Sequence, residues 1–240
     1  MWVRCAGKEK ERVSVMLLAN SDGVKKKPCV VMKQLNPTTA EALTQNKVSR
    51  NGFGPTVWKK LAAGVPSDVQ VFANSKSWFT SDIIVKWLQF NFAFNTAPLL
   101  LLLDEFTGHN TDEVQAAAKR LNITIMMIPP GLTSKAQPAD VSWNKPFKVK
   151  MREYWTNKLV LDMKNMSTFR ASAPSRQELL GWILNAWDYL SEDTIKSGFV
   201  KALLVDSPVI LTPQIAEEHD IPDSLLNGLE NINIVNDIEF

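Results

Sequence analysis

Residues 98–109 read PLLLLLDEFTGH, and this stretch decides the fold class. The leucine run stops at Asp104, and a continuous apolar run of this length is typical of a strand inside a sheet that is covered on both faces. Residues 111–121 follow with apolar positions at helical spacing, and residues 123–128 form a second apolar strand. A strand, a helix and a strand within about 30 residues make a βαβ unit. The sequence therefore predicts an α/β fold whose sheet is parallel at this point.

The chain before this unit predicts a hairpin. Residues 12–19 and 28–33 both have the composition of strands. The turn signal between them ends in Asp22-Gly23, a pair that supplies the positive φ that hairpin turns need. We expect two antiparallel strands here.

The segment between the hairpin and the leucine run is less regular. Residues 37–66 are rich in Thr, Asn, Gly and Pro, so we expect a long irregular connection with one short helix around Trp58. Residues 69–73 favour another short strand. Residues 78–92 predict a helix that Thr80 or Ser81 caps, because apolar residues then recur at helical spacing.

The chain after the unit is helical and then acidic. Helical periodicity begins near Val141, and residues 176–204 predict two further helices. Residues 206–240 carry eight Asp and Glu residues and no Lys or Arg, so residues 1–205 carry 27 − 17 = +10 charges. We expect three regions, namely a core over 1–165, C-terminal helices over 166–205 and an acidic tail over 206–240.

Composition excludes several classes of protein. Of 240 residues, 45% are hydrophobic and 22% are charged, which is ordinary globular usage and excludes a largely disordered chain. The leucine run is far shorter than the roughly 20 residues of a membrane-spanning helix. Two cysteines make neither a disulfide framework nor a zinc site, and the first residues lack a signal-peptide pattern. We expect a nuclear or cytoplasmic protein that is neither secreted nor bound to a membrane.

Two aspartates are the candidate catalytic and metal-binding residues. Asp104 ends the leucine strand, and Asp140 lies in the loop that follows the next strand, so parallel strands deliver both to the carboxyl edge of the sheet, where active sites collect. Paired carboxylates need a cation, or one of them must stay protonated. Oxygen ligands suit Mg²⁺ or Mn²⁺, and two such metals can clamp the attacking and leaving oxygens of a phosphodiester. The alternatives are ordinary ones. Asp104 is then a loop acid, and Asp140 caps the helix that begins near Val141.

Several segments together resemble the DDE superfamily of endonucleases, as found in pogo- and Tigger-type transposases. Asp104 to His109 is similar to the family's second-aspartate motif, and Gln137-Pro138-Ala139-Asp140 with its flanks is similar to the third-acid segment. The flanks and the weaker matches are residues 129–134, 144–148, 19–23 and 77–80. The resemblance spans roughly residues 10 to 200.

The resemblance implies a fold and an activity. The family fold is RNase H-like, a mixed five-stranded sheet flanked by helices, here with a helical C-terminal extension. In such proteins three acids bind two divalent cations, Mg²⁺ or Mn²⁺. The implied activity is the cutting and joining of DNA. The implied partners are DNA and a second copy of the chain in a homo-oligomer, with no small-molecule cofactor.

One departure from the family pattern concerns the first aspartate. In the family it lies on a strand before the segment that matches residues 13–19, and residues 1–10 contain no Asp. We therefore expect a domain truncated at its N-terminus, with the first strand missing and an acid set reduced to Asp104 and Asp140. Whether such a chain is an enzyme stays open. The alternative is an inactive domesticated or decayed fragment that only binds DNA or protein.

Basic residues beside Asp140 are the candidate substrate-binding residues. Lys145, Lys148 and Arg152 are spaced three and four apart, so they share one face of the predicted helix and can contact phosphates. The alternative is a solvated helix face. His109 is expected to orient a phosphate or to lie near the metal, unless it is a loop histidine packed at a helix start.

Overall fold

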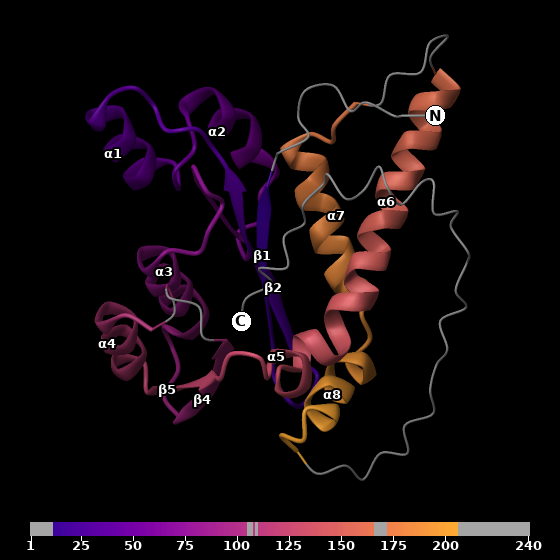
Figure 1. Ribbon diagram of the computed structural model, residues 1–240. Coiled ribbons are helices and arrows are strands. Elements are labelled where there is room, and N and C mark those ends of the chain that lie inside the picture. Colours follow the sequence, from indigo (N-terminus) through magenta and orange to yellow (C-terminus); the bar gives the residue numbers. More distant parts are fainter. Residues whose placement is uncertain (1–11, 105–107, 109, 166–171, 206–240) are drawn as a thin grey trace.

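The computed structural model describes residues 12–104, 108, 110–165 and 172–205, and the structural statements that follow concern these residues. A hairpin lies at the centre of the molecule (Figure 1). Strands β1 (Val13–Ala19) and β2 (Lys25–Lys33) pair antiparallel, and β3 (Gln70–Asn74) adds to β2 in parallel. Gly23 has φ of 88°, which confirms the turn signal that the sequence placed there.

Two helices lie within the connection expected over residues 37–66: the short helix predicted around Trp58 is confirmed, whereas the helix over residues 40–49 was not predicted. Helix α1 (Ala40–Ser49) begins where Thr39 Oγ1 accepts a 3.2 Å hydrogen bond from the Ala42 amide. Helix α2 (Pro55–Leu61) starts with proline, which suits a first turn, and a 3₁₀ turn, η1 (Ala62–Gly64), extends it. Helix α1 buries only Asn46, so its sequence carries no apolar period to read.

The βαβ unit is confirmed. Helix α3 (Ser81–Phe92), with Thr80 as its N-cap residue, leads into β4 (Leu99–Asp104). Helix α4 (Asp112–Arg120) then leads into β5 (Ile123–Ile128), and Thr111 caps α4 by accepting from the Val114 amide. Strands β4 and β5 are parallel, with Asp104 opposite Ile128 at the end of the ladder.

The chain has the mixed α/β architecture flanked by helices that the sequence predicted, but its described strands form two sheets. Within the described residues β1 has β2 as its strand neighbour and β4 has β5, so no described strand bridges the two sheets. The prediction that the leucine strand is covered on both faces was also wrong. Leu100 is 55% exposed and Met126 on β5 is 50% exposed, because α3 and α4 cover one face of this pair.

The C-terminal helices share the hydrophobic core. After β5 come α5 (Thr133–Ala136), a π-helical turn η2 (Ala139–Trp143) and the long helix α6 (Asn144–Asn165). Helices α7 (Arg176–Tyr189) and α8 (Glu192–Lys201) confirm the two helices predicted over residues 176–204. In the first of them, however, Tyr189 is 65% exposed and lies outside the apolar face.

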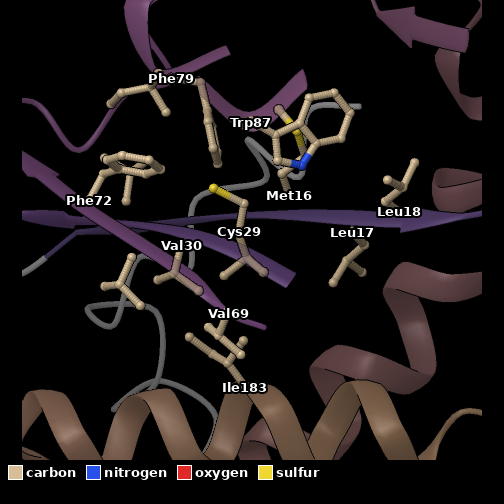
Figure 2. Packing of buried hydrophobic residues seen from close by; sticks show 14 of the residues in the cluster. Met16, Leu17, Leu18, Cys29, Val30, Val69, Phe72, Phe79, Trp87 and Ile183 are labelled. Carbon is tan, nitrogen blue, oxygen red and sulfur yellow. The ribbon is translucent and has the colours of Figure 1, made fainter. Parts of the chain in front are cut away.

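The central sheet packs between two layers of helices. In Figure 2, Met16 and Cys29 extend toward Phe79 and Trp87, whereas Leu17 and Val30 extend toward Ile183 of α7. Burial raises the pKa of the Cys29 thiol far above its ordinary value, so this thiol stays protonated and behaves as a core residue. No helix within the described residues is long and apolar enough to span a membrane.

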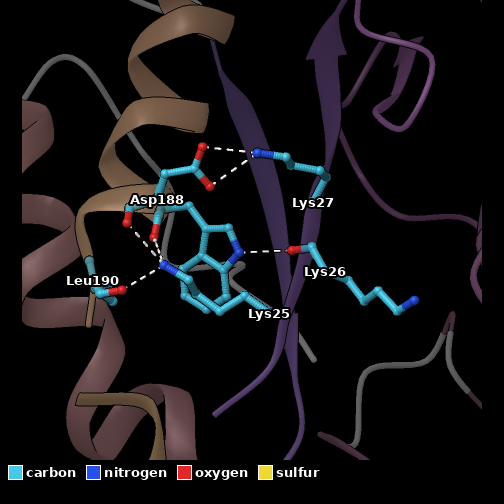
Figure 3. A network of polar contacts seen from close by, with 6 residues as sticks. Lys25, Lys26, Lys27, Asp188 and Leu190 are labelled. Atoms are coloured by element: carbon cyan, nitrogen blue, oxygen red, sulfur yellow. Dashed lines mark hydrogen bonds and ion pairs between the residues drawn. The ribbon is translucent and has the colours of Figure 1, made fainter. Parts of the chain in front are cut away.

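Lys25 links the β1–β2 hairpin to the C-terminal end of α7 through hydrogen bonds (Figure 3). Lys25 Nζ donates to the backbone carbonyls of Trp187 at 2.7 Å, Asp188 at 3.1 Å and Leu190 at 2.5 Å. Lys27 Nζ forms an ion pair of 2.9 Å with Asp188. The Trp187 indole donates to the Lys26 carbonyl at 2.8 Å. Because the last carbonyls of a helix lack most of their intrahelical donors, Lys25 adds a charged donor there, although the Trp187 carbonyl also accepts from the Leu190 amide at 3.2 Å.

Candidate functional site

The two candidate aspartates reach the site from different elements. Asp104 is the last residue of β4 and is half-buried. Asp140 is the second residue of η2, which follows β5 after a short loop and one helical turn. Pro138 precedes η2 and α6 begins only at Asn144, so Asp140 lies inside a helical turn and is not the helix cap of the alternative interpretation.

The charge of Asp140 is shaped by its neighbours. Burial of its carboxylate raises the pKa of Asp140, although the residue as a whole keeps an exposed surface. A hydrogen bond from Asn144 and the positive charge of Lys148 lower that pKa, and the negative charge of Asp104 raises it again. Asp104, at the end of β4, thus lies close enough for its charge to raise the pKa of Asp140.

Helix α8 holds the segment that carries Asp140 in place. Ser142 Oγ is 2.7 Å from Ser197 Oγ, and the Trp143 indole donates to the Ile195 carbonyl at 3.1 Å. Gly198 permits this approach, since a Cβ there would lie 2.6 Å from Trp143 Nε1 and 2.7 Å from the Pro138 carbonyl. The position of Asp140 therefore depends on a helix that lies some fifty residues further along the chain.

The basic residues extend from this point along α6. Partial burial lowers the pKa of Lys148, the negative charge of Asp140 raises it, and the positive charge of Arg152 lowers it again. Lys148 therefore lies between Asp140 and Arg152. Lys145 and Arg152 are exposed on the same side of the helix as Lys148. Lys145 precedes Lys148 along α6, and Arg152 follows it. We call these three side chains the basic face, and we call Asp104 and Asp140 the acid pair. The basic face begins beside Asp140 of the acid pair.

The residues present fit a divalent cation in part. A cation held by Asp104 and Asp140 would favour the ionised form of Asp140, whose pKa burial raises most and the negative charge of Asp104 raises less. Carboxylate oxygens are suitable ligands for Mg²⁺ or Mn²⁺. No group of three or more His, Cys, Asp or Glu residues that could hold a metal occurs within the part of the chain that the structure describes. Asp104 and Asp140 would be the two protein carboxylates on such an ion.

Two polar residues near Asp140 escaped the sequence analysis, and one candidate cannot be placed. Asn144 is 6% exposed and donates from Nδ2 to Asp140 Oδ1 at 2.6 Å. Gln137 is 2% exposed, three residues before Asp140. The spacing of four between Asp140 and Asn144 was the available signal for Asn144, because it places both side chains on one side of a helix. His109 lies outside the described residues.

Comparison with known proteins identifies the family. The chain matches the family described as DDE superfamily endonuclease over residues 10–199. The chain belongs to this family. It is therefore a transposase-derived domain, and the resemblance that the sequence motifs indicated, with its mixed α/β fold, is confirmed.

Two curated relatives of the DDE superfamily domain are pogo transposable elements. The chain is 27% identical over 205 residues to "Pogo transposable element with KRAB domain" of Homo sapiens, and 28% identical over 205 residues to the protein of the same description in Mus musculus. In both comparisons the match covers 83% of this chain and 30% of the relative. The chain thus spans about a third of the length of these relatives. No solved structure matches it.

Proposed function

We propose that this domain binds DNA along the basic face and holds a divalent cation between Asp104 and Asp140. The observation that carries the proposal is the position of Asp140, where the charges of both Lys148 and Asp104 act on its carboxylate. A phosphate bound by the basic face would lie next to the acid pair. Carboxylates next to basic residues suit a phosphodiester substrate. The lysine and arginine residues neutralise the phosphate, and the carboxylates hold the cation.

The reaction that we propose is cation-dependent cutting of DNA. When bound, the cation supplies Lewis-acid polarisation of a phosphate and activation of water. The residues of the chain provide the rest. Asp104 and Asp140 provide the carboxylates for the ion, and Lys145, Lys148 and Arg152 hold the DNA backbone without reading its sequence. With two carboxylates rather than three, we expect slow cutting and readily measured binding.

Binding is tested by the salt dependence of affinity for a short DNA duplex, followed by fluorescence anisotropy. We expect the wild-type chain to bind, and Lys145→Ala/Lys148→Ala/Arg152→Ala to bind more weakly, with a salt slope lower by roughly 3 because about one counterion is released for each phosphate contact. The control variant Lys47→Ala/Lys59→Ala/Lys60→Ala removes the same charge from exposed positions on α1 and α2. Equal slopes for the two triple variants would exclude the basic face as the DNA site.

Cutting is tested with supercoiled plasmid in Mg²⁺ or Mn²⁺. We expect nicking that Asp104→Asn and Asp140→Asn each abolish while leaving DNA affinity in EDTA within about twofold, because neither neutral amide removes a phosphate contact. If wild type binds DNA but nicks it no faster than the two variants in either metal, the domain is a binding module and the cutting part of the proposal is wrong.

A further inference from the structure

The side-chain amide of Asn144 lies beside Asp140 but belongs neither to the acid pair nor to the basic face, so its role in the site is not yet assigned. Its Nδ2 donates to Asp140 Oδ1 at 2.6 Å. The orientation of the amide follows from chemistry, because an ionised carboxylate only accepts hydrogen bonds and therefore faces the NH₂ end. The opposite end of the amide, Oδ1, is buried and accepts no hydrogen bond from the described residues.

The Nδ2 end fixes the carboxylate of Asp140. Asn144 is the first residue of α6 and lies one turn after Asp140, so both side chains project from continuous helical backbone. Its neighbours Trp143 and Phe147 are 2% and 0% exposed, which leaves the amide little room to rotate. A short, charge-assisted hydrogen bond on rigid backbone occupies one oxygen of Asp140 and leaves the other oxygen for a cation.

The Oδ1 end needs a proton donor. Buried acceptors in native proteins nearly always have a partner, and an exception indicates a bound water, an ion or a functional role. The unsatisfied Asn144 Oδ1 therefore favours an occupant that donates hydrogen bonds, and the water molecules on a hydrated divalent cation are such donors.

Resting on the proposed function, we propose that Asn144 is a positioning residue of the metal site. Its Nδ2 holds Asp140 with one oxygen left for the cation, and its Oδ1 accepts a hydrogen bond from a water molecule carried by that cation. Asn144 does not bind the metal itself. Groups that orient a metal ligand in this way are worth about 10- to 100-fold in metal affinity.

The test is Mn²⁺ binding to the whole 240-residue chain, followed by electron paramagnetic resonance and by water-proton relaxation. We expect Asn144→Ala to weaken Mn²⁺ binding at least about tenfold and to change the relaxation caused by the Mn²⁺ that remains bound. Asn144→Gln, which keeps an amide on a longer arm, is expected to recover part of the affinity. DNA affinity in EDTA should be the same for all three proteins.

Asn46→Ala is the matched control. Asn46 is 4% exposed, and its Oδ1 accepts hydrogen bonds of 3.2 and 2.8 Å from the Arg50 side chain, also one turn away on a helix. It lies on α1, which carries no candidate site residue. A purely structural effect would lower thermal stability in both alanine variants and leave Mn²⁺ affinity unchanged in both.

The outcomes separate this inference from the proposed function. If wild type and Asn46→Ala bind Mn²⁺ and Asn144→Ala binds it equally well with the same relaxation, Asn144 has no positioning role and the acid pair stands. If wild type binds Mn²⁺ no better than Asp104→Asn and Asp140→Asn, the metal site itself is wrong and the inference falls with it.

Discussion

The indole nitrogen of Trp143 donates a 3.1 Å hydrogen bond to the carbonyl of Ile195, which joins the turn that carries Asp140 to helix α8. The two rings of Trp143 and Trp187 are 5.8 Å apart, so the same tryptophan also contacts α7. A segment that follows a loop is usually mobile, but this one is packed between two helices. The geometry of the acid pair therefore depends on the C-terminal helices.

Gly198→Ala is expected to destabilise the domain by about 2 kcal/mol, because the added methyl group would overlap Trp143 Nε1 and the Pro138 carbonyl. Gly181→Ala on α7 is the control, since a Cβ there meets no atom within 4 Å. Replacing a helical glycine by alanine in open space should stabilise the protein by up to about 1 kcal/mol. Urea denaturation of both variants measures the difference, and shifts of the same sign would contradict the packing described for α8.

Lys25→Met is expected to lower the free energy of unfolding by about 2 to 3 kcal/mol, since it leaves three helix-end carbonyls without their charged donor. Lys26→Met is the matched control, because the exposed Lys26 side chain extends away from this network (Figure 3). Thermal and urea unfolding provide the comparison. Equal stability of the two variants would show that Lys25 contributes no more than an exposed surface lysine.

The stability contributed by Asp140 should depend on pH. Its folded-state pKa is raised above the ordinary aspartate value of 3.8, mainly by burial, so folding disfavours the ionised form. The carboxylate is therefore unfavourable at neutral pH, and the penalty disappears as the pH falls through the folded-state pKa. Asp140→Asn, which can still accept from Asn144, should melt at a higher temperature than wild type at pH 7, and the gap should close on acidification.

The control for this pH experiment is Asp68→Asn, an exposed carboxylate before β3 and away from the acid pair. Its melting temperature should follow that of wild type at each pH. Adding Mg²⁺ at pH 7 should raise the melting temperature of wild type and leave that of Asp140→Asn unchanged, because only wild type keeps both carboxylates. A gap that widens on acidification would mean that the pKa of Asp140 is shifted in the opposite direction.

The sequence alone determined the elements with strong local signals and the family. The leucine strand ending at Asp104, the βαβ unit and the turn at Gly23 were predicted because apolar period and turn chemistry act over a few neighbouring residues. The motifs around Asp104 and Asp140 identified the DDE superfamily. Helix α1 was missed because a polar helix that buries only Asn46 has no period to detect.

Only the tertiary structure decided how distant side chains meet. The influence of the Asp104 charge on Asp140 and the hydrogen bond from Trp143 to α8 each join elements that are separate in the sequence. Lys25 likewise read as an ordinary charged residue, yet it satisfies the end of α7. Such contacts follow from the packing of whole helices and strands around one core, which short-range sequence patterns do not encode.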